Sequence, residues 1–215
     1  MITSKTSFLA LIGNPISHSM SPIIQNAAIQ YLGLDLVYIA IPCQNNDLEI
    51  VLNSLKKINC KGLNITIPFK EKVFDICTEI SPVAKKVKAI NTLKLNNNAN
   101  WQGTNTDVDG FIHPLKNLNL TNKTSIILGS GGAARSVIQG LKELKLSKIT
   151  IISRNKDSLN KLVNDFNQDI TIEGFISTDK TINNYIPETD LIINTTPVGM
   201  VKTTNEDLMP FGQSL

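Results

Sequence analysis

A lysine just beyond an apolar strand is the first group in this sequence that could do chemistry. In "NITIPFKE", residues 64–71, apolar Ile65 and Ile67 alternate with polar residues until Pro68 ends the strand. Lys70 follows two positions later. A lysine alone is most often a surface cation with a buried stem. At a strand end, however, its ammonium can stabilise negative charge on a ligand if other polar groups meet it there.

A glycine turn in the second half of the chain predicts a dinucleotide site. "GSGGAA", residues 129–134, follows an apolar strand and opens a helix, and it matches the pattern G-x-G-x-x-A. The first glycine allows the turn, the second lets a pyrophosphate approach the backbone, and Ala134 permits close helix packing. The helix N-terminus attracts the anion. The predicted cofactor contacts are Gly129, Ser130, Gly131, Gly132 and Ala133.

The end of the next strand distinguishes between two cofactors. An NAD site usually has an acidic residue there, which binds the ribose hydroxyls. This sequence has "SRNK" instead, so that Ser153, Arg154 and Asn155 are available and a guanidinium can hold a 2′-phosphate. A solvated basic turn is the alternative, but together with the glycine turn the pattern favours NADP.

A serine-rich loop in the first half could bind a small ligand. "GNPISHSMSP" places Ser17, Ser19 and Ser21 at alternate positions between two prolines, at the start of a helix. Hydroxyl groups in this position suit a polyol or a carboxylate. For Ser21 a purely structural role as the helix cap is an equal alternative. His18 is interpreted as a hydrogen-bonding residue within the loop.

The first half alternates strands and helices around these groups. Strands are predicted at 8–13, 36–41 and 62–67, and the helices between them give a parallel sheet that is covered on both faces. The first helix has Ser21 as a possible cap and Pro22 in its first turn. Its predicted buried face consists of Ile24, Ala27, Ala28 and Tyr31.

The chain from residue 69 to 118 is predicted to complete this domain. Helical segments are expected near 73–77 and 83–87, and strands in "AINTLKL" and "WQGTN" form a hairpin that adds an antiparallel edge. A helix follows from Asp107 to Leu118, with a bend at Pro114. The fold class is therefore α/β, with a mostly parallel sheet between layers of helices in the first domain.

A second strand–helix series begins at residue 124. The helix after the glycine turn has a regular apolar stripe, and further strands are predicted in "KITIISR", "DITIEGF" and "DLIINTT". We therefore expect two domains, residues 1–106 and residues 107–215. The apolar stripe consists of Ala134, Val137, Ile138, Leu141 and Leu144.

Composition indicates a cytoplasmic protein that acts on a small molecule. Of 215 residues, 41% are hydrophobic and 18% charged, as in ordinary globular proteins, and a net charge of +3 does not indicate nucleic acid as a partner. Cys43, Cys60 and Cys77 lack pairing spacing, which suggests reduced thiols, and two distant histidines predict no metal site. No signal or membrane-spanning pattern is present. Both a monomer and a homodimer remain open.

Seven motifs occur in the order and spacing of one known family. They are "GNPISHSMSPIIQNA", "NITIPFKE", "AINTL", "GTNTDVDGF", "GSGGAAR", "SRN" and "NTTPVGM". They extend over essentially the whole chain, which resembles the shikimate dehydrogenase family. The resemblance implies a shikimate-binding domain in residues 1–106, a Rossmann domain for NADP(H) in residues 107–215, and an active site in the groove between them.

The resemblance also implies roles for individual residues. Ser19 and Ser21 would hold the substrate carboxylate, and Thr66 and Asn91 would bind ring hydroxyls. Lys70 resembles the catalytic lysine. The remaining implied positions are the catalytic partner Asp107, the adenosine-phosphate contacts Ser153, Arg154 and Asn155, and Thr195 in "NTT" beside the cofactor.

The implied reaction is the reversible, NADPH-dependent reduction of 3-dehydroshikimate to shikimate, a step towards chorismate and the aromatic amino acids. Hydride transfer to a ketone places negative charge on oxygen, which the ammonium group of Lys70 can stabilise and protonate. The carboxylate of Asp107 would orient the lysine and favour its protonated form.

Three alternatives remain. A quinate-using relative is disfavoured by the pair Ser19 and Ser21, and a non-catalytic ligand-binding protein by the presence of both Lys70 and Asp107. A folate-linked NADP dehydrogenase is disfavoured by the serine loop and the "NTD" motif. Members of the family continue for some tens of residues beyond the point that matches Leu215. A shortened form with a less closed nicotinamide site and lower activity is therefore one expectation.

Overall fold

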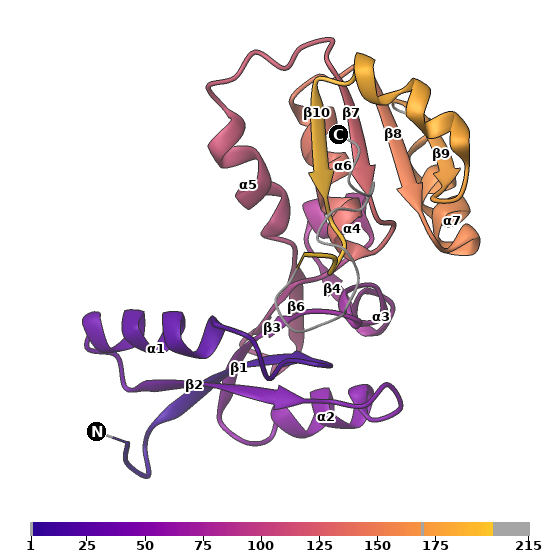
Figure 1. Ribbon diagram of the computed structural model, residues 1–215. Coiled ribbons are helices and arrows are strands. Elements are labelled where there is room, and N and C mark those ends of the chain that lie inside the picture. The colour runs from indigo at the N-terminus through magenta and orange to yellow at the C-terminus, as the bar shows by residue number, and fades with distance from the viewer. Residues whose placement is uncertain (1, 169, 200–215) are drawn as a thin grey trace. The chain divides into compact units, whose positions relative to one another are not determined.

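The computed structural model describes residues 2–168 and 170–199. It divides the chain into two compact units, Met1–Thr106 and Asp107–Leu215, each of which contains a sheet with helices (Figure 1). Within the described part of the chain, no helix is both long enough and apolar enough to cross a bilayer.

The sheet of the first unit is built from β-α-β connections, as the alternating pattern predicted. The described strands have the order β2-β1-β3-β5-β6-β4. The strands are β1 (Ser7–Gly13), β2 (Leu36–Pro42), β3 (Cys60–Ile65), β4 (Glu79–Ile80), β5 (Thr92–Leu95) and β6 (Trp101–Thr104). The helices are α1 (Ser21–Tyr31), α2 (Leu48–Leu55), α3 (Lys70–Ile76) and α4 (Pro82–Val87).

Strand direction places the polar groups of the first unit at one edge of this sheet. β1 pairs in parallel with both β2 and β3, whereas β5 pairs antiparallel to both β3 and β6. The beginning of β5 therefore lies beside the end of β3, in the register Asn64 opposite Thr92. The expected hairpin is present, and the short strand β4, which the sequence did not reveal, pairs in parallel with β6 outside it.

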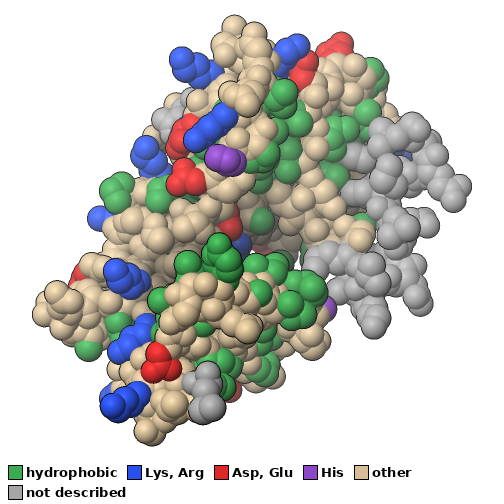
Figure 2. All heavy atoms as spheres, turned by 90° about the vertical axis from the view of Figure 1, so that its left-hand side faces the viewer, with side chains coloured by type: hydrophobic (Ala, Val, Ile, Leu, Met, Phe, Trp, Pro, Cys, Tyr) green, Lys and Arg blue, Asp and Glu red, His purple; other side chains and the backbone are tan. Residues whose placement is uncertain are grey.

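Helix α1 covers the sheet with a different face from the predicted one. Ile29 is buried, and Asn26 is half-buried because its side chain bonds to the backbone of β2. Figure 2 shows hydrophobic side chains gathered on this part of the surface. The prediction was wrong because an amide on the inward face takes the place of an apolar contact. The predicted inward residues Ile24, Ala27, Ala28 and Tyr31 are all exposed.

The opposite face of the first sheet carries the larger core. Helix α2 contributes three buried leucines, and Phe69, Val73 and Trp101 join them. The indole N–H of Trp101 donates to the carbonyl of Leu52 at 3.0 Å, so that its one polar atom is satisfied inside the core. Phe69 is 0% exposed and immediately precedes Lys70. The buried ring of Phe69 therefore anchors the start of α3.

The second unit contains a parallel sheet in the order β10-β7-β8-β9 among its described strands. Two helices cover one face and short 3-10 turns cover the other. The strands are β7 (Thr124–Leu128), β8 (Lys148–Ser153), β9 (Thr171–Ile176) and β10 (Leu191–Asn194). The helices are α5 (Asp107–Ile112), α6 (Gly132–Glu143) and α7 (Lys156–Phe166), and the 3-10 turns are His113–Leu115, Lys180–Asn184 and Ile186–Glu188.

Helix α6 is buried on more sides than its apolar stripe predicted. Its stripe packs on the sheet, while a Cβ at Gly140 would lie only 2.6 Å from Phe111 of α5 on another side. Arg135 is 1% exposed and forms an ion pair with Asp165 of α7. The helix predicted from Asp107 to Leu118 ends earlier, because Pro114 cannot continue the α-helical bonding and a 3-10 turn replaces it.

Candidate active site

The polar groups of the first unit gather where β1 and β3 end and β5 begins. Gly13 ends β1 and allows Thr66 to approach: a Cβ on Gly13 would lie 2.3 Å from the Thr66 methyl carbon. The backbone N–H of Thr66 donates to the carbonyl of Ile12 at 2.9 Å, and the N–H of Asn14 donates to the carbonyl of Ile67 at 2.9 Å. Thr66 is therefore fixed beside the serine loop, one residue beyond the end of β3.

Ser19 and Ser21 lie at the start of α1, and Ser21 does not have the capping role that was one alternative for it. The residue that precedes the helix is Met20, and the Ser21 side chain does not cap it. Instead the Ser19 hydroxyl accepts a hydrogen bond from the backbone N–H of Ser21 at 3.2 Å. Both serines are half-buried. Ser19 therefore accepts the first N–H of the helix, and the Ser21 hydroxyl is not used as a cap.

Lys70 is the first residue of α3 and is half-buried. The buried ring of Phe69 fixes the residue before it, and the Lys70 carbonyl accepts a hydrogen bond from the Ile90 N–H at 2.8 Å. This bond ties the start of α3 to the segment that leads into Asn91. The local geometry thus holds the backbone of Lys70 at the same sheet edge as Thr66.

Asn91 is 8% exposed and uses its amide to join two segments. Its Oδ1 accepts hydrogen bonds from the Thr92 hydroxyl at 2.9 Å and from the Thr106 backbone N–H at 3.0 Å. Its Nδ2 donates to the Thr106 hydroxyl oxygen at 2.9 Å. Asp107 follows Thr106 directly and opens the second unit, so Lys70 and Asp107 are each described within their own unit.

Sequence reasoning missed a tyrosine in this network. Tyr38 of β2 is 3% exposed, and its hydroxyl donates to Asn64 Oδ1 at 2.8 Å. Burial raises the pKa of the Tyr38 phenol to about 12, against a hydrogen bond from the Ser21 side chain that lowers this pKa. The amide of Asn64 in turn donates to the Thr92 hydroxyl at 3.3 Å. The signal in the sequence was one polar group in each of two otherwise mostly apolar strands, the Tyr38 hydroxyl in β2 and the Asn64 amide in β3.

These same residues line a pocket of about 320 Å³ on the α1 side of the sheet. Its polar lining includes Tyr38, Asn64 and Thr92, and Gly62 adds no side chain to it. The other polar residues of the lining are Gln25, Lys61 and Lys94. A Cβ at Gly62 would lie 3.3 Å from the Leu9 side chain, which forms another part of the wall. A continuous chain of hydrogen bonds therefore runs beside this cavity from Tyr38 through Asn64 and Thr92 to Asn91.

The glycine turn of the second unit has the geometry that its pattern requires. Gly129 has φ +104, where glycine is favoured, and a Cβ there would lie 2.7 Å from the hydroxyl oxygen of Thr195. Thr195 follows β10 and is held by its own N–H and hydroxyl, which both donate to the Leu128 carbonyl. The two predicted positions Gly129 and Thr195 are therefore in contact.

Open space lies above the next glycine. A Cβ at Gly131 would meet no described atom within 4 Å. No described side chain caps α6 and its first turn has no acidic residue, so its first N–H groups suit an anion. Gly132 and Ala133 form that first turn. The residues present therefore fit the pyrophosphate of a dinucleotide.

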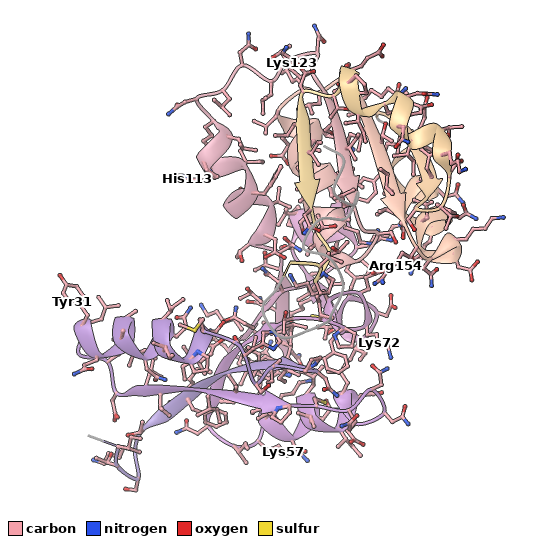
Figure 3. All side chains as sticks on the ribbon, in the orientation of Figure 1. Tyr31, Lys57, Lys72, His113, Lys123 and Arg154 are labelled. Carbon is pink, nitrogen blue, oxygen red and sulfur yellow. The ribbon has the colours of Figure 1, made fainter. Side chains whose placement is uncertain are left out.

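Hydroxyl groups join this turn to the end of β8. Ser130 Oγ lies 2.7 Å from Ser153 Oγ and 2.6 Å from Ser158 Oγ. Asn155 caps α7, since its side chain accepts a hydrogen bond from the Ser158 N–H at 2.9 Å. Arg154 is exposed and projects from the carboxyl end of β8, where Figure 3 labels it. The structure thus brings together the predicted residues of this turn and leaves the guanidinium at its rim.

Comparison with known proteins identifies the family. Residues 11–93 match the model of the shikimate dehydrogenase substrate binding domain, and residues 114–212 match that of shikimate / quinate 5-dehydrogenase. A relative named shikimate dehydrogenase (NADP(+)) from Prochlorococcus marinus subsp. pastoris is 78% identical over 213 residues, which are 99% of this chain and 75% of the relative.

Solved structures agree with this result. Shikimate dehydrogenase from Aquifex aeolicus has a TM-score of 0.86 at 34% identity, over 99% of this chain and 76% of that one. The Listeria monocytogenes enzyme, in complex with shikimate and NAD, has a TM-score of 0.81 at 30% identity, over 97% and 75%. From its sequence, its two domain matches and its fold, the chain belongs to the shikimate dehydrogenase family.

Proposed function

We propose that this chain catalyses the reversible, NADPH-dependent reduction of 3-dehydroshikimate to shikimate. Residues 1–106 bind shikimate and residues 107–215 bind the cofactor. Membership of the family makes the chain an NADP-dependent oxidoreductase, and the relative with 78% identity has NADP in its name. The three cysteines are free, which supports the cytoplasm as the compartment.

One observation carries the proposal: the substrate groups come from a single edge of the first sheet. Ser19 and Ser21 follow β1, Thr66 and Lys70 follow β3, and Asn91 precedes the antiparallel strand β5. Ser19 and Ser21 hold the carboxylate of the substrate. Thr66 and Asn91 bind the ring hydroxyls, and the fixed position of the Asn91 amide supports this role.

Lys70 and Asp107 act on the ketone. The ammonium group of Lys70 stabilises the negative charge that develops on the carbonyl oxygen and donates a proton to that oxygen. The carboxylate of Asp107 accepts a hydrogen bond from a substrate hydroxyl. In the reverse direction, Lys70 accepts the proton of the shikimate hydroxyl.

NADPH, when bound, supplies the hydride that reduces the ketone carbon. Gly129, Ser130, Gly131, Gly132 and Ala133 hold its pyrophosphate, with the N-terminus of α6 as the electrostatic partner. Arg154 binds the 2′-phosphate, flanked by Ser153 and Asn155, and Thr195 lies beside the cofactor. The open space above Gly131 supports this arrangement.

A steady-state assay of NADPH formation tests the proposal. Purified protein is given shikimate or quinate with NADP or NAD, and absorbance of the reduced cofactor is followed. We expect the highest kcat/KM with shikimate and NADP. A higher value with quinate would assign the chain to the alternative, a dehydrogenase of broader specificity. Shikimate binding without turnover would support the other alternative, a non-catalytic ligand-binding form, and would overturn the proposed reaction.

A further inference from the structure

Three serine hydroxyls meet between the glycine turn and helix α7. Ser130 Oγ lies 2.7 Å from Ser153 Oγ and 2.6 Å from Ser158 Oγ, distances that are typical of O–H···O hydrogen bonds. Ser130 belongs to the turn, Ser153 ends β8, and Ser158 lies in the first turn of α7. Ser158 has no role in the proposed cofactor site, although its hydroxyl touches a residue that has one.

These three serines are largely shielded from water. Ser130 is 9% exposed, Ser153 is 7% exposed and Ser158 is half-buried. A buried polar group that loses its partner costs about 1–3 kcal/mol, so each hydroxyl hydrogen has to be directed to an acceptor. The directions of three hydrogens therefore determine what the serines can offer to a ligand.

The backbone of Asn155 supplies the remaining partners. Its carbonyl can accept from Ser158 Oγ at 3.2 Å and from Ser153 Oγ at 3.4 Å, and its N–H donates to Ser153 Oγ at 3.2 Å. Each serine has one hydrogen to donate. Without a ligand, Ser130 can donate to one neighbouring serine, which then donates to the Asn155 carbonyl, while the other serine donates to Ser130. All three hydrogens are then used inside the protein.

A bound phosphate group requires a different arrangement, because its oxygens act as acceptors. When Ser130 donates to such an oxygen, the hydrogens in its two serine contacts must come from Ser153 and Ser158. These contacts, at 2.7 and 2.6 Å, are shorter than the contacts of the same two serines with the Asn155 carbonyl, at 3.4 and 3.2 Å. Both hydrogens can therefore turn to Ser130 Oγ, and no hydroxyl hydrogen loses its acceptor.

We propose that Ser158 is a positioning residue of the cofactor site, which donates to Ser130 Oγ and so directs the Ser130 hydrogen to the pyrophosphate of the bound dinucleotide. The inference rests on the proposed function, because it needs the pyrophosphate at the glycine turn. Ser158 acts through Ser130 and not by contact with the 2′-phosphate. Since NADP and NAD share the pyrophosphate, Ser158 contributes equally to the binding of both.

Steady-state kinetics of Ser158→Ala test this role. The change removes the hydroxyl but keeps the backbone N–H that donates to the Asn155 side chain and caps α7. We expect the KM for NADP and the KM for NAD to rise by the same factor, about two- to tenfold, the range for one neutral hydrogen bond. The kcat and the KM for shikimate should stay constant. A rise for NADP alone would place Ser158 at the 2′-phosphate and overturn the proposal.

A double-mutant cycle with Ser130→Ala separates this inference from the proposed function. Ser130→Ala should raise the KM for both cofactors about tenfold or more, because it removes a hydrogen bond to a charged group. In that background Ser158→Ala should change neither KM by more than about 1.5-fold. Effects that simply add would overturn the inference alone. Unchanged KM values in Ser130→Ala would instead overturn the place of Ser130 in the proposed cofactor site, and the inference with it.

Two further variants show whether the Ser158 hydroxyl itself is responsible. Ser158→Thr keeps a hydroxyl and should hold both KM values within about twofold of the unmodified ones. Ser147→Ala is the matched control: its hydroxyl also makes a neutral hydrogen bond, to the Asn122 carbonyl at 3.0 Å, but it precedes β8 and so lies at the opposite end of that strand from Ser153. Ser147→Ala should leave the KM values unchanged. An equal rise in Ser158→Ala and in either of these two variants would overturn the proposal.

Discussion

Replacing Gly13 with alanine would push a methyl group into the wall of the proposed shikimate site. The new Cβ would lie 2.3 Å from Thr66 Cγ2, 2.6 Å from Ile16 Cγ2 and 3.0 Å from the Ile67 carbonyl oxygen. Carbon atoms in contact are normally about 3.5–4.0 Å apart. The Thr66 methyl group would therefore have to retreat by about 1.2 Å, the difference between roughly 3.5 Å and the 2.3 Å found here.

Two effects of different size follow from this displacement. Overpacking of this kind lowers the free energy of unfolding by about 1–3 kcal/mol. Gly13 lies outside the left-handed region, so the cost is steric rather than a backbone strain. Displacement of a substrate-positioning group by about 1 Å lowers the catalytic rate on the order of 100-fold. The loss of activity should therefore greatly exceed what the loss of folded protein explains.

Urea denaturation and kcat/KM for shikimate, measured on the same preparation, separate the two effects. Gly33→Ala is the control: Gly33 has φ +63, so alanine is strained there, but no described atom lies within 4 Å of the new Cβ. Gly33→Ala should cost about 1 kcal/mol of stability and leave kcat/KM unchanged. A folded Gly13→Ala protein with kcat/KM within about twofold of the unmodified value would refute the reasoning.

Three further predictions concern cofactor choice, the buried ion pair and pH. Arg154→Ala should raise the KM for NADP about 10- to 100-fold, because a charge-assisted hydrogen bond to phosphate contributes about 1.5–3 kcal/mol. The KM for NAD should stay within about twofold of its unmodified value. An equal rise in KM for both cofactors would contradict the assignment. Asp165→Ala should lower the free energy of unfolding in urea by about 3–5 kcal/mol, because it leaves the buried Arg135 guanidinium without this carboxylate; a loss below about 1 kcal/mol would contradict this. Folding raises the pKa of Tyr38 from 10.0 to about 12, so its contribution to stability is full below pH 10 and is lost as the pH rises towards 12. Tyr38→Phe should lose less stability than the unmodified protein over that range, and an equal loss in the two proteins would refute the assignment.

The second unit was the easier one to predict from sequence. Each of its described strands carries at least two isoleucine or leucine residues, and helices α6 and α7 have apolar stripes that pack on the sheet. The glycine turn also depends on local geometry, since Gly129 adopts a positive φ within a strand–turn–helix segment. Local rules of this kind can be read from neighbouring residues, so the pattern was sufficient.

The errors in the first unit come from interactions between distant residues. The face of α1 was predicted from its apolar residues, but Asn26 turns inward because the backbone of Tyr38 offers it both a donor and an acceptor. The network through Asn64 depends on strand order, since β1 separates β2 from β3 and the Tyr38 ring must reach across it. No periodicity in the sequence contains that information.

The turnover of Lys70→Ala tests the central claim most directly. Lys72→Ala is its control, an exposed lysine two positions further along α3 (Figure 3). With shikimate and NADP, Lys70→Ala should lower kcat about 100- to 10,000-fold, as expected for loss of a general acid–base group, while shikimate still binds and Lys72→Ala remains fully active. If Lys70→Ala keeps the kcat of the unmodified protein, Lys70 does not carry the reaction and the account is wrong.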